Sequence, residues 1–148
     1  MFVVVKIIPL ASHESESVFH APYFLSHVQA GFPSPADDYM DRKLDLNEHL
    51  IKHPAATFYC RVSGHSMNGL GIFDGDTLIV DRAITPKNGD VVLAVLDGEL
   101  TCKKLDIQGK RLLSANDKYP PIPIKEWAEF EVEGVVTSSI RYHNVCSR

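Results

Sequence analysis

The chain has 148 residues, of which 45% are hydrophobic and 23% are charged, and its formal net charge is −4. This length and composition predict one globular domain with a buried core. Lysine and arginine do not gather in a block, so a basic surface that binds nucleic acid directly is disfavoured. The cysteines Cys60, Cys102 and Cys146 are far apart and odd in number, which argues against a disulfide framework or a zinc ribbon and indicates free thiols in a reducing cytoplasm.

Residues 1–45 are predicted to form an extended N-terminal arm. They open with the apolar run "MFVVVKIIPL", which Lys6 and Pro9 interrupt and which falls short of the roughly 20 residues that cross a bilayer. The run also lacks a basic start and an A-x-A-like end, so we expect neither a membrane anchor nor a signal peptide. The polar "ASHESES" and the proline-containing "AGFPSPADD" follow, with few apolar residues to anchor them.

The globular domain is predicted over residues 46–148, after the arm, and a short helix is expected near its start. The segment "LDLNEHLIKHP" places Leu46 and Leu50 on one helical face, and Pro54 ends the helix. His49 and His53 are four residues apart in this segment, but no third ligand accompanies them and H-E-x-x-H is absent. We therefore expect two solvated histidines on a surface helix and no metal site.

The remaining residues predict a mainly β domain. Short β-branched or apolar runs alternate with Gly, Asn, Asp and Pro, which is the pattern of an all-β fold. Asp97-Gly98 between two such runs is typical of a tight hairpin turn. The expected strands lie within residues 57–63, 77–81, 90–96, 99–107, 110–115 and 130–136.

The least ordinary stretch is "RVSGHSMNGLGIFDGDTLIVDRAI", in which Ser66 lies among four glycines. A serine becomes a nucleophile when a base takes its proton, and histidine is the usual base. His65 is adjacent to Ser66, but neighbouring side chains of an extended segment point to opposite faces. Cys60 and Cys102 lie within strand-like runs, where a buried and unreactive thiol is expected.

Lysine is the remaining candidate base, provided that its amine is neutral when it acts. Half-neutrality at pH 7 requires about 4 kcal/mol, which burial in apolar surroundings can supply. The run "ELTCKKLDI" offers two lysines on a predicted core strand. Alternation places Lys103 with Thr101 and Leu105 on one face, and Lys104 with Cys102 on the other. Only one of the pair can point at a given site, and this pattern favours Lys103 without excluding Lys104.

These features together resemble the LexA/UmuD family of self-cleaving Ser-Lys peptidases, and most closely its UmuD-type branch. "SGHSMNGLGIFDGD" is similar to the family's nucleophile box, S-G-x-S-M followed by G-I-x-D-G-D. "NGDVVLAVLDGELTCKKL" is similar to the hairpin that bears the lysine, and "HVQAGFPSPADDY" to the cleavage-site region. "DLNEHLIKHPAATFY" and "SANDKYPPIPI" extend the likeness over most of the chain from His27 onward. The resemblance implies a signal-peptidase-like β-fold of several twisted sheets with one short helix.

The resemblance also implies the roles of individual residues. Ser66 is the expected nucleophile and Lys103, the first lysine of the pair, is the expected general base. The expected scissile bond joins Ala30 to Gly31, where Ala30 replaces the cysteine of some UmuD relatives. The backbone N–H groups of Ser66 and Met67 are the expected oxyanion donors. No cofactor or metal is expected.

The function that the resemblance implies is self-cleavage stimulated by a RecA–single-stranded DNA filament in the cytoplasm. The shortened product is then expected to serve, as a homodimer, as the accessory subunit of an error-prone translesion DNA polymerase (polymerase V) with a UmuC-like catalytic subunit. Three alternative functions fit the sequence less well. A self-cleaving repressor needs a DNA-binding domain before the cleavage site, and a signal peptidase needs a membrane anchor. A protease-inactive binding subunit would not need both Ser66 and Lys103.

Overall fold

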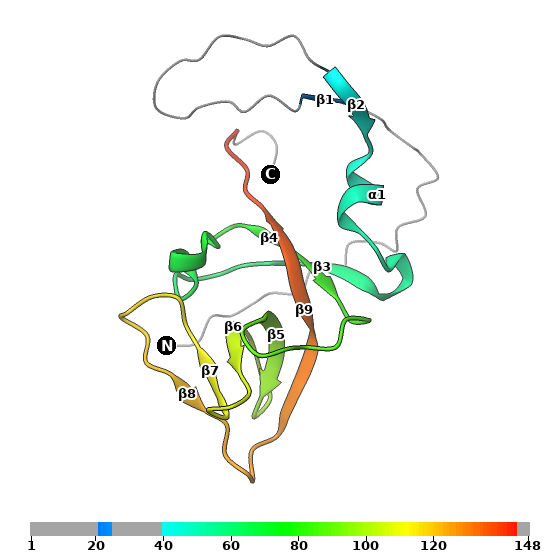
Figure 1. Cartoon of the computed structure of the whole chain (residues 1–148). Helices are drawn as coiled ribbons and strands as arrows, with labels where there is room; N and C mark the ends of the chain where they lie inside the picture. The colour runs from blue at the N-terminus through cyan, green and yellow to red at the C-terminus, as the bar shows by residue number, and fades with distance from the viewer. Residues whose placement is uncertain (1–20, 25–39, 145–148) are drawn as a thin grey trace. The chain divides into compact units, whose positions relative to one another are not determined.

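The structure is a computed structural model that describes residues 21–24 and 40–144 (Figure 1). These residues divide between two compact units: those up to Lys52 belong to one, and those from His53 onward belong to the other. Ala30, Gly31 and Cys146 lie outside the described residues. Of the expected arm, the structure describes only residues 21–24 and 40–45. The boundary between arm and domain expected between residues 45 and 46 stays a prediction.

The unit that ends at Lys52 contains a two-stranded sheet and a short helix. Strands β1 (Ala21–Phe24) and β2 (Met40–Leu44) pair antiparallel, although the sequence predicted no strand in this part of the chain. Helix α1 (Leu46–Leu50) begins after Asp45, whose carboxylate accepts a 2.9 Å hydrogen bond from the backbone N–H of Asn47. This is the N-cap arrangement that satisfies a free helix donor.

Helix α1 lies within the expected segment but is shorter than expected. It ends at Leu50, and Pro54 instead begins the 3-10 helix η1 (Pro54–Ala56) of the next unit. None of the α1 side chains is buried, and Leu46 is 61% exposed. Within the described part of the chain, no helix has the length and apolar character needed to cross a membrane.

The larger unit is built on one antiparallel sheet, so the predicted mainly β fold is confirmed. Its strand order is β3-β4-β9-β5-β6-β7-β8, and Figure 1 shows the long β9 running between β4 and β5. The sequence predicted six of these strands, but missed the two-residue β8. The strands are β3 (Thr57–Arg61), β4 (Thr77–Asp81), β5 (Val91–Leu96), β6 (Glu99–Asp106), β7 (Arg111–Leu113), β8 (Ile122–Pro123) and β9 (Phe130–Ile140).

The hairpin between β5 and β6 forms as predicted. Leu96 pairs with Glu99, so Asp97 and Gly98 alone make the turn. Both have positive φ angles, 49° and 81°, which a tight turn between right-twisted strands requires. The hairpin fixes the register of β6, and thereby decides which of its lysines faces which side of the sheet.

Alternating side chains of the sheet fill two apolar clusters. On β5, Leu93 belongs to one cluster while its neighbour Val92 belongs to the other. The same alternation on β6 assigns Cys102 to the first cluster and Leu105 to the second. Met67, which directly follows Ser66, is 2% exposed and packs in the first cluster. The turn that carries the expected nucleophile is thus anchored in the core.

Candidate active site

Ser66 lies in the loop that joins β3 to β4. The loop is closed at its base, because the backbone N–H of Val62 donates to the Asp76 carbonyl (2.8 Å) and that of Gly75 donates to the Val62 carbonyl (2.9 Å). Inside the loop, a turn at Ser66 leads into the 3-10 helix η2 (Asn68–Leu70). The serine is therefore held in a closed loop with its own backbone hydrogen bonds.

Lys103 of β6 meets this serine. Its Nζ donates a 2.8 Å hydrogen bond to Ser66 Oγ, although the two residues are 37 positions apart. Ser66 is 1% exposed and Lys103 is 3% exposed, and the fully buried Val92 is the cross-strand partner of Lys103. Lys104 is only half-buried and makes no such contact. The structure thus brings together Ser66 and the lysine that alternation favoured.

Three acceptors surround the Lys103 amine. Besides Ser66 Oγ, Nζ donates to Thr101 Oγ1 at 3.1 Å and to the Cys102 carbonyl at 3.2 Å. Burial lowers the pKa of Lys103 from its ordinary value of 10.5, while an interaction with Cys102 opposes this shift to a smaller extent. The geometry and the pKa both favour an amine that can lose its proton next to the serine.

A second segment, residues 114–116 after β7, binds the turn of Ser66; we call it the strap. The Ala115 N–H donates to the Ser66 carbonyl (2.8 Å), and the Ala115 carbonyl accepts from the Gly69 N–H (2.6 Å). Asn116 Nδ2 donates to the His65 carbonyl (2.9 Å). Sequence reasoning gave the strap no role, since nothing in "SAN" marks a contact with residues about 50 positions earlier.

The expected oxyanion donors have no competing partner. Among the described residues, neither the backbone N–H of Ser66 nor that of Met67 donates to any acceptor. The strap instead donates hydrogen bonds to the carbonyls of His65 and Ser66. These carbonyls belong to the same two peptide units as the N–H groups and point to the opposite side. Two free N–H groups beside a serine are what stabilisation of an oxyanion requires.

An ion pair at Asp76 reinforces the base of the loop. Asp76 is 2% exposed, and its carboxylate accepts from Arg141 Nε (3.1 Å), Arg141 Nη2 (2.9 Å) and the Phe73 N–H (2.8 Å). Arg141 also donates to the Gly71 carbonyl (2.6 Å) and stacks on the Phe73 ring, 3.9 Å from its centroid. Burial acts to raise the pKa of Asp76, but the bonds from Arg141 and Phe73 outweigh it and lower that pKa below 3.8.

Two expectations about histidines need correction. Residues around His65 form a turn rather than an extended segment, so strand alternation does not apply; His65 is exposed whereas Ser66 is buried, which still separates their side chains. His53 lies beyond the end of α1 and is not a free surface histidine. Its Nδ1 lies 2.6 Å from Oδ2 of the buried Asp81, so His53 is tied to the sheet.

The thiols of Cys60 and Cys102 are poorly suited to catalysis or metal binding. Cys60 and Cys102 are buried free thiols, as predicted, and burial raises the pKa of each to about 12. A thiol with such a pKa forms almost no thiolate and is a poor nucleophile or metal ligand. Over the residues that the structure describes, no group of three or more His, Cys, Asp or Glu side chains is placed to hold a metal ion.

Contact between strap and turn leaves no room for a side chain at Gly69. A Cβ there would overlap the Ala115 carbonyl oxygen, which accepts the bond from Gly69 itself. We expect Gly69→Ala to destabilise the fold by about 1–3 kcal/mol and to shift the turn of Ser66, since overpacking forces backbone movement. Thermal unfolding measures the first effect, and the rate of the self-cleavage that the sequence predicts measures the second.

Gly98→Ala is the matched control for this substitution. Gly98 has a positive φ of 81°, and a Cβ there would meet nothing within 4 Å, so its replacement strains the backbone of the β5–β6 turn without touching the strap. We expect a comparable loss of stability, of about 1 kcal/mol, with an unchanged cleavage rate. Equal loss of cleavage in both variants would show that general destabilisation, rather than the strap, is responsible.

Comparison with known proteins identifies the family. The description "Peptidase S24-like" matches residues 22–137. The chain belongs to the Peptidase S24-like family. It is 42% identical to Protein ImpA of Salmonella typhimurium over 130 residues (88% of this chain and 90% of that one), and 39% identical to Protein MucA of Escherichia coli over 145 residues (97% and 99%). It is 45% identical to Protein SamA of S. typhimurium strain LT2 over 121 residues (81% and 84%).

Membership in the Peptidase S24-like family confirms the resemblance inferred from the sequence. The family is one of self-cleaving serine peptidases, and the matched region contains Ser66, Lys103 and the Ala30-Gly31 dipeptide. The alignment to MucA extends over nearly the full length of both chains. The family match by itself does not assign a role to any individual residue.

Proposed function

We propose that this chain is a serine peptidase that cleaves its own Ala30–Gly31 bond with a Ser66–Lys103 dyad. The observation that carries the proposal is the 2.8 Å contact between Lys103 Nζ and Ser66 Oγ, made where both residues are buried. Family membership supports the reaction class, and the lowered pKa of Lys103 supports its role as the base. No other ionisable side chain among the described residues bonds to Ser66 Oγ.

The three contacts of the Lys103 amine suit its neutral form. A neutral amine has two N–H donors and one lone pair, so it can donate to Thr101 Oγ1 and the Cys102 carbonyl while it accepts the Ser66 O–H. The same contacts hold a protonated amine, which then donates to all three oxygens. Lys103 can thus take up and return a proton without moving, as a general base requires.

The proposed reaction is acyl transfer. Lys103 takes the Ser66 hydroxyl proton as Ser66 Oγ attacks the Ala30 carbonyl carbon, and the N–H groups of Ser66 and Met67 stabilise the oxyanion. The C–N bond to Gly31 then breaks, and Lys103 returns the proton to the leaving amine. A water molecule, activated in turn by Lys103, hydrolyses the ester to Ser66 and releases the Ala30 carboxylate.

The proposed cellular role follows from the relatives rather than from the site. A UmuD-like place in the SOS response is supported by the identities of 39–45% to MucA, ImpA and SamA. We propose that a RecA–single-stranded DNA filament in the cytoplasm promotes docking of the arm. The shortened chain, as a homodimer with little direct contact to nucleic acid, then joins a UmuC-like catalytic subunit of a translesion polymerase.

The test is the N-terminus of the cleavage product. Purified protein is incubated at alkaline pH, or near neutral pH with RecA, ATP and single-stranded DNA, and the fragments are identified by mass spectrometry. We expect a product comprising residues 31–148, formed by the unaltered chain and absent from Ser66→Ala. A product with another N-terminus, or the same product from Ser66→Ala, would contradict the proposal. An intact chain under both conditions would favour a protease-inactive subunit.

A further inference from the structure

The only tryptophan of the chain, Trp127, lies on the surface. Its side chain is 83% exposed, whereas tryptophan in folded proteins is highly buried on average. It belongs to the connection between β8 and β9, drawn in orange at the bottom of Figure 1. Tryptophan is one of the residue types that contribute most to binding between proteins. Its exposure here therefore indicates a docking surface.

The turn around Trp127 is held in place by hydrogen bonds. The Ala128 N–H donates to the Lys125 carbonyl (3.0 Å), which closes the turn. The Asp97 N–H donates to the Glu129 carbonyl (2.8 Å), and the Glu129 N–H donates to Asp97 Oδ1 (3.0 Å). These two bonds join the turn to the β5–β6 hairpin. A partner that binds at Trp127 has little backbone to order, which lowers the entropic cost of binding.

Carboxylates surround this turn. Residues 97–99 and 125–131, which we call the Trp127 surface, hold five acidic residues and one basic residue, Lys125. Their formal charge is −4, as large as that of the whole chain. The backbone bond from the Ile124 N–H to the Lys110 carbonyl brings one further cation to its border. The five acidic residues, all exposed, are Asp97, Glu99, Glu126, Glu129 and Glu131.

The carboxylates of the Trp127 surface are not neutralised within the part of the chain that the structure describes. There, no lysine, arginine or histidine forms an ion pair with any of the five. Strand pairing sets Glu99 opposite Leu96 and Glu131 opposite Val95. Because Leu96 and Val95 are adjacent on β5, Glu99 and Glu131 point to opposite faces of the sheet. Negative charge thus borders Trp127 from both faces of this end of the sheet.

This charge selects the kind of partner that the Trp127 surface fits. It repels nucleic acid and anionic membranes, and a second copy of the chain meeting it through the same surface would oppose like charges. A segment rich in arginine carries the complementary charge. The guanidinium group also stacks on indole rings and donates paired hydrogen bonds to carboxylates. Arginine therefore matches both the aromatic and the acidic part of the surface.

We propose that the Trp127 surface binds an arginine-rich segment of a partner protein. A guanidinium group of the partner stacks on the indole of Trp127, and the surrounding carboxylates bind neighbouring cations of the same segment. The inference goes beyond the proposed self-cleavage and does not depend on it, since none of these residues belongs to the site of Ser66 and Lys103. Because the attraction is between exposed charges, it should weaken as the salt concentration rises.

The experiment titrates the full-length chain with a hexa-arginine peptide at neutral pH and low salt. Fluorescence anisotropy of a labelled peptide gives the Kd, and the emission of Trp127, measured with unlabelled peptide, reports contact with the indole. We expect binding that weakens with salt and changes the emission of Trp127, whereas a hexa-glutamate peptide does neither. No binding of hexa-arginine, or binding that leaves the emission of Trp127 unchanged, would overturn the proposal.

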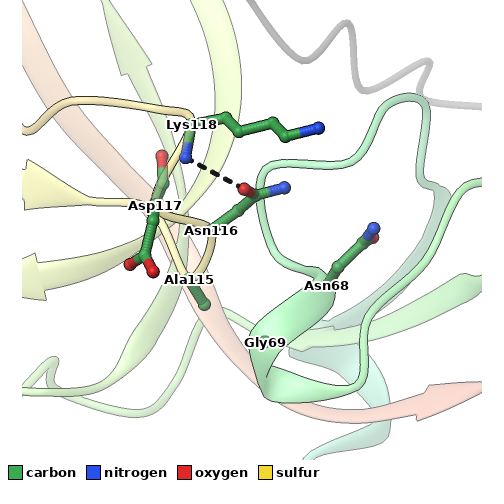
Figure 2. Close-up of a pocket in the computed structure, with 7 residues that line it drawn as sticks. Asn68, Gly69, Ala115, Asn116, Asp117 and Lys118 are labelled. Atoms are coloured by element: carbon green, nitrogen blue, oxygen red, sulfur yellow. Dashed lines mark hydrogen bonds between the residues drawn. The ribbon is translucent and has the colours of Figure 1, made fainter.

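Variants separate this surface from general attraction to an acidic protein. Trp127→Ala should weaken binding about tenfold and Trp127→Phe less, because indole is the best cation–π partner. Glu129→Gln with Glu131→Gln should weaken it as well. Glu48→Gln with Asp117→Asn removes the same charge elsewhere, since Glu48 lies on α1 and Asp117 lines a hollow beside the strap (Figure 2), and should leave the Kd unchanged.

Two results would contradict the Trp127 surface. One is a normal Kd for Trp127→Ala, and the other is equal weakening by the two pairs of charge-removing substitutions. All of the substituted side chains are exposed, so the variants should unfold at nearly the same temperature as the unaltered chain. Thermal unfolding of the same samples checks this, so that a loss of binding is assigned to the surface itself.

Discussion

Lys103→Met should abolish the proposed cleavage of the Ala30–Gly31 bond, whereas Lys104→Met should leave the rate unchanged. Methionine matches the length and apolar stem of lysine but cannot take a proton from Ser66. Loss of the general base and of the activated nucleophile together is expected to cost at least about 10³-fold in rate. Lys104 is the matched control because it neighbours Lys103 on β6 but lies on the opposite face of the sheet.

The pH dependence tests the same role in the unaltered protein. The proposed base must be neutral to act, so the cleavage rate should rise about tenfold per pH unit below the folded pKa of Lys103 and level off above it. Burial lowers that pKa from 10.5, so the plateau should begin below pH 10.5. A rate that does not rise with pH anywhere below pH 10.5 would contradict the assignment of Lys103 as the base.

Stability measurements show whether the inactive variant is folded. Because the pKa of Lys103 is lower in the folded state than in the unfolded one, the unfolded chain binds more protons between the two values, and stability rises with pH in that window. Lys103→Met removes this dependence. It should be more stable than the unaltered chain at neutral pH, with a difference that narrows toward pH 10.5. If the Lys103→Met chain is unfolded, its inactivity reflects the loss of structure and not the loss of the base.

Asp76→Ala should lower the free energy of unfolding by about 3 kcal/mol, or the melting temperature by roughly 10 °C. The substitution leaves the Phe73 N–H and the guanidinium of Arg141 without the carboxylate that accepts from both. Because Arg141 also holds the Gly71 carbonyl at the end of η2, cleavage should slow as well. Thermal unfolding at pH 7 measures the stability change.

The effect of Asp76→Ala should depend on pH in a defined direction. The folded pKa of Asp76 lies below 3.8, so its contribution is fully present above about pH 4 and is lost as the pH falls through the folded pKa. The stability difference between the variant and the unaltered chain should therefore shrink in acid. Asp117→Asn, an exposed site without a bonded partner, is the control and should change stability by less than about 0.5 kcal/mol.

Local patterns were sufficient to predict six strands of the larger sheet and the hairpin between β5 and β6. Alternating apolar residues fix which face of a strand is buried, because successive side chains point to opposite sides. That rule placed Lys103 with Thr101 and Leu105, and all three are buried in the structure. β1 and β2 escaped prediction because they lie in a polar and proline-containing part of the chain, where no such alternation marks a buried face.

The sequence by itself determined the family, the β-rich fold and the residue types available for chemistry, because these depend on motifs and short-range periodicity. Only the tertiary structure decided which groups meet. The contact of the strap with the turn of Ser66 and the pairing of Asp76 with Arg141 each join segments about 45 to 65 positions apart. Such contacts follow from the strand order of the sheet, which brings loops together without regard to their separation along the chain.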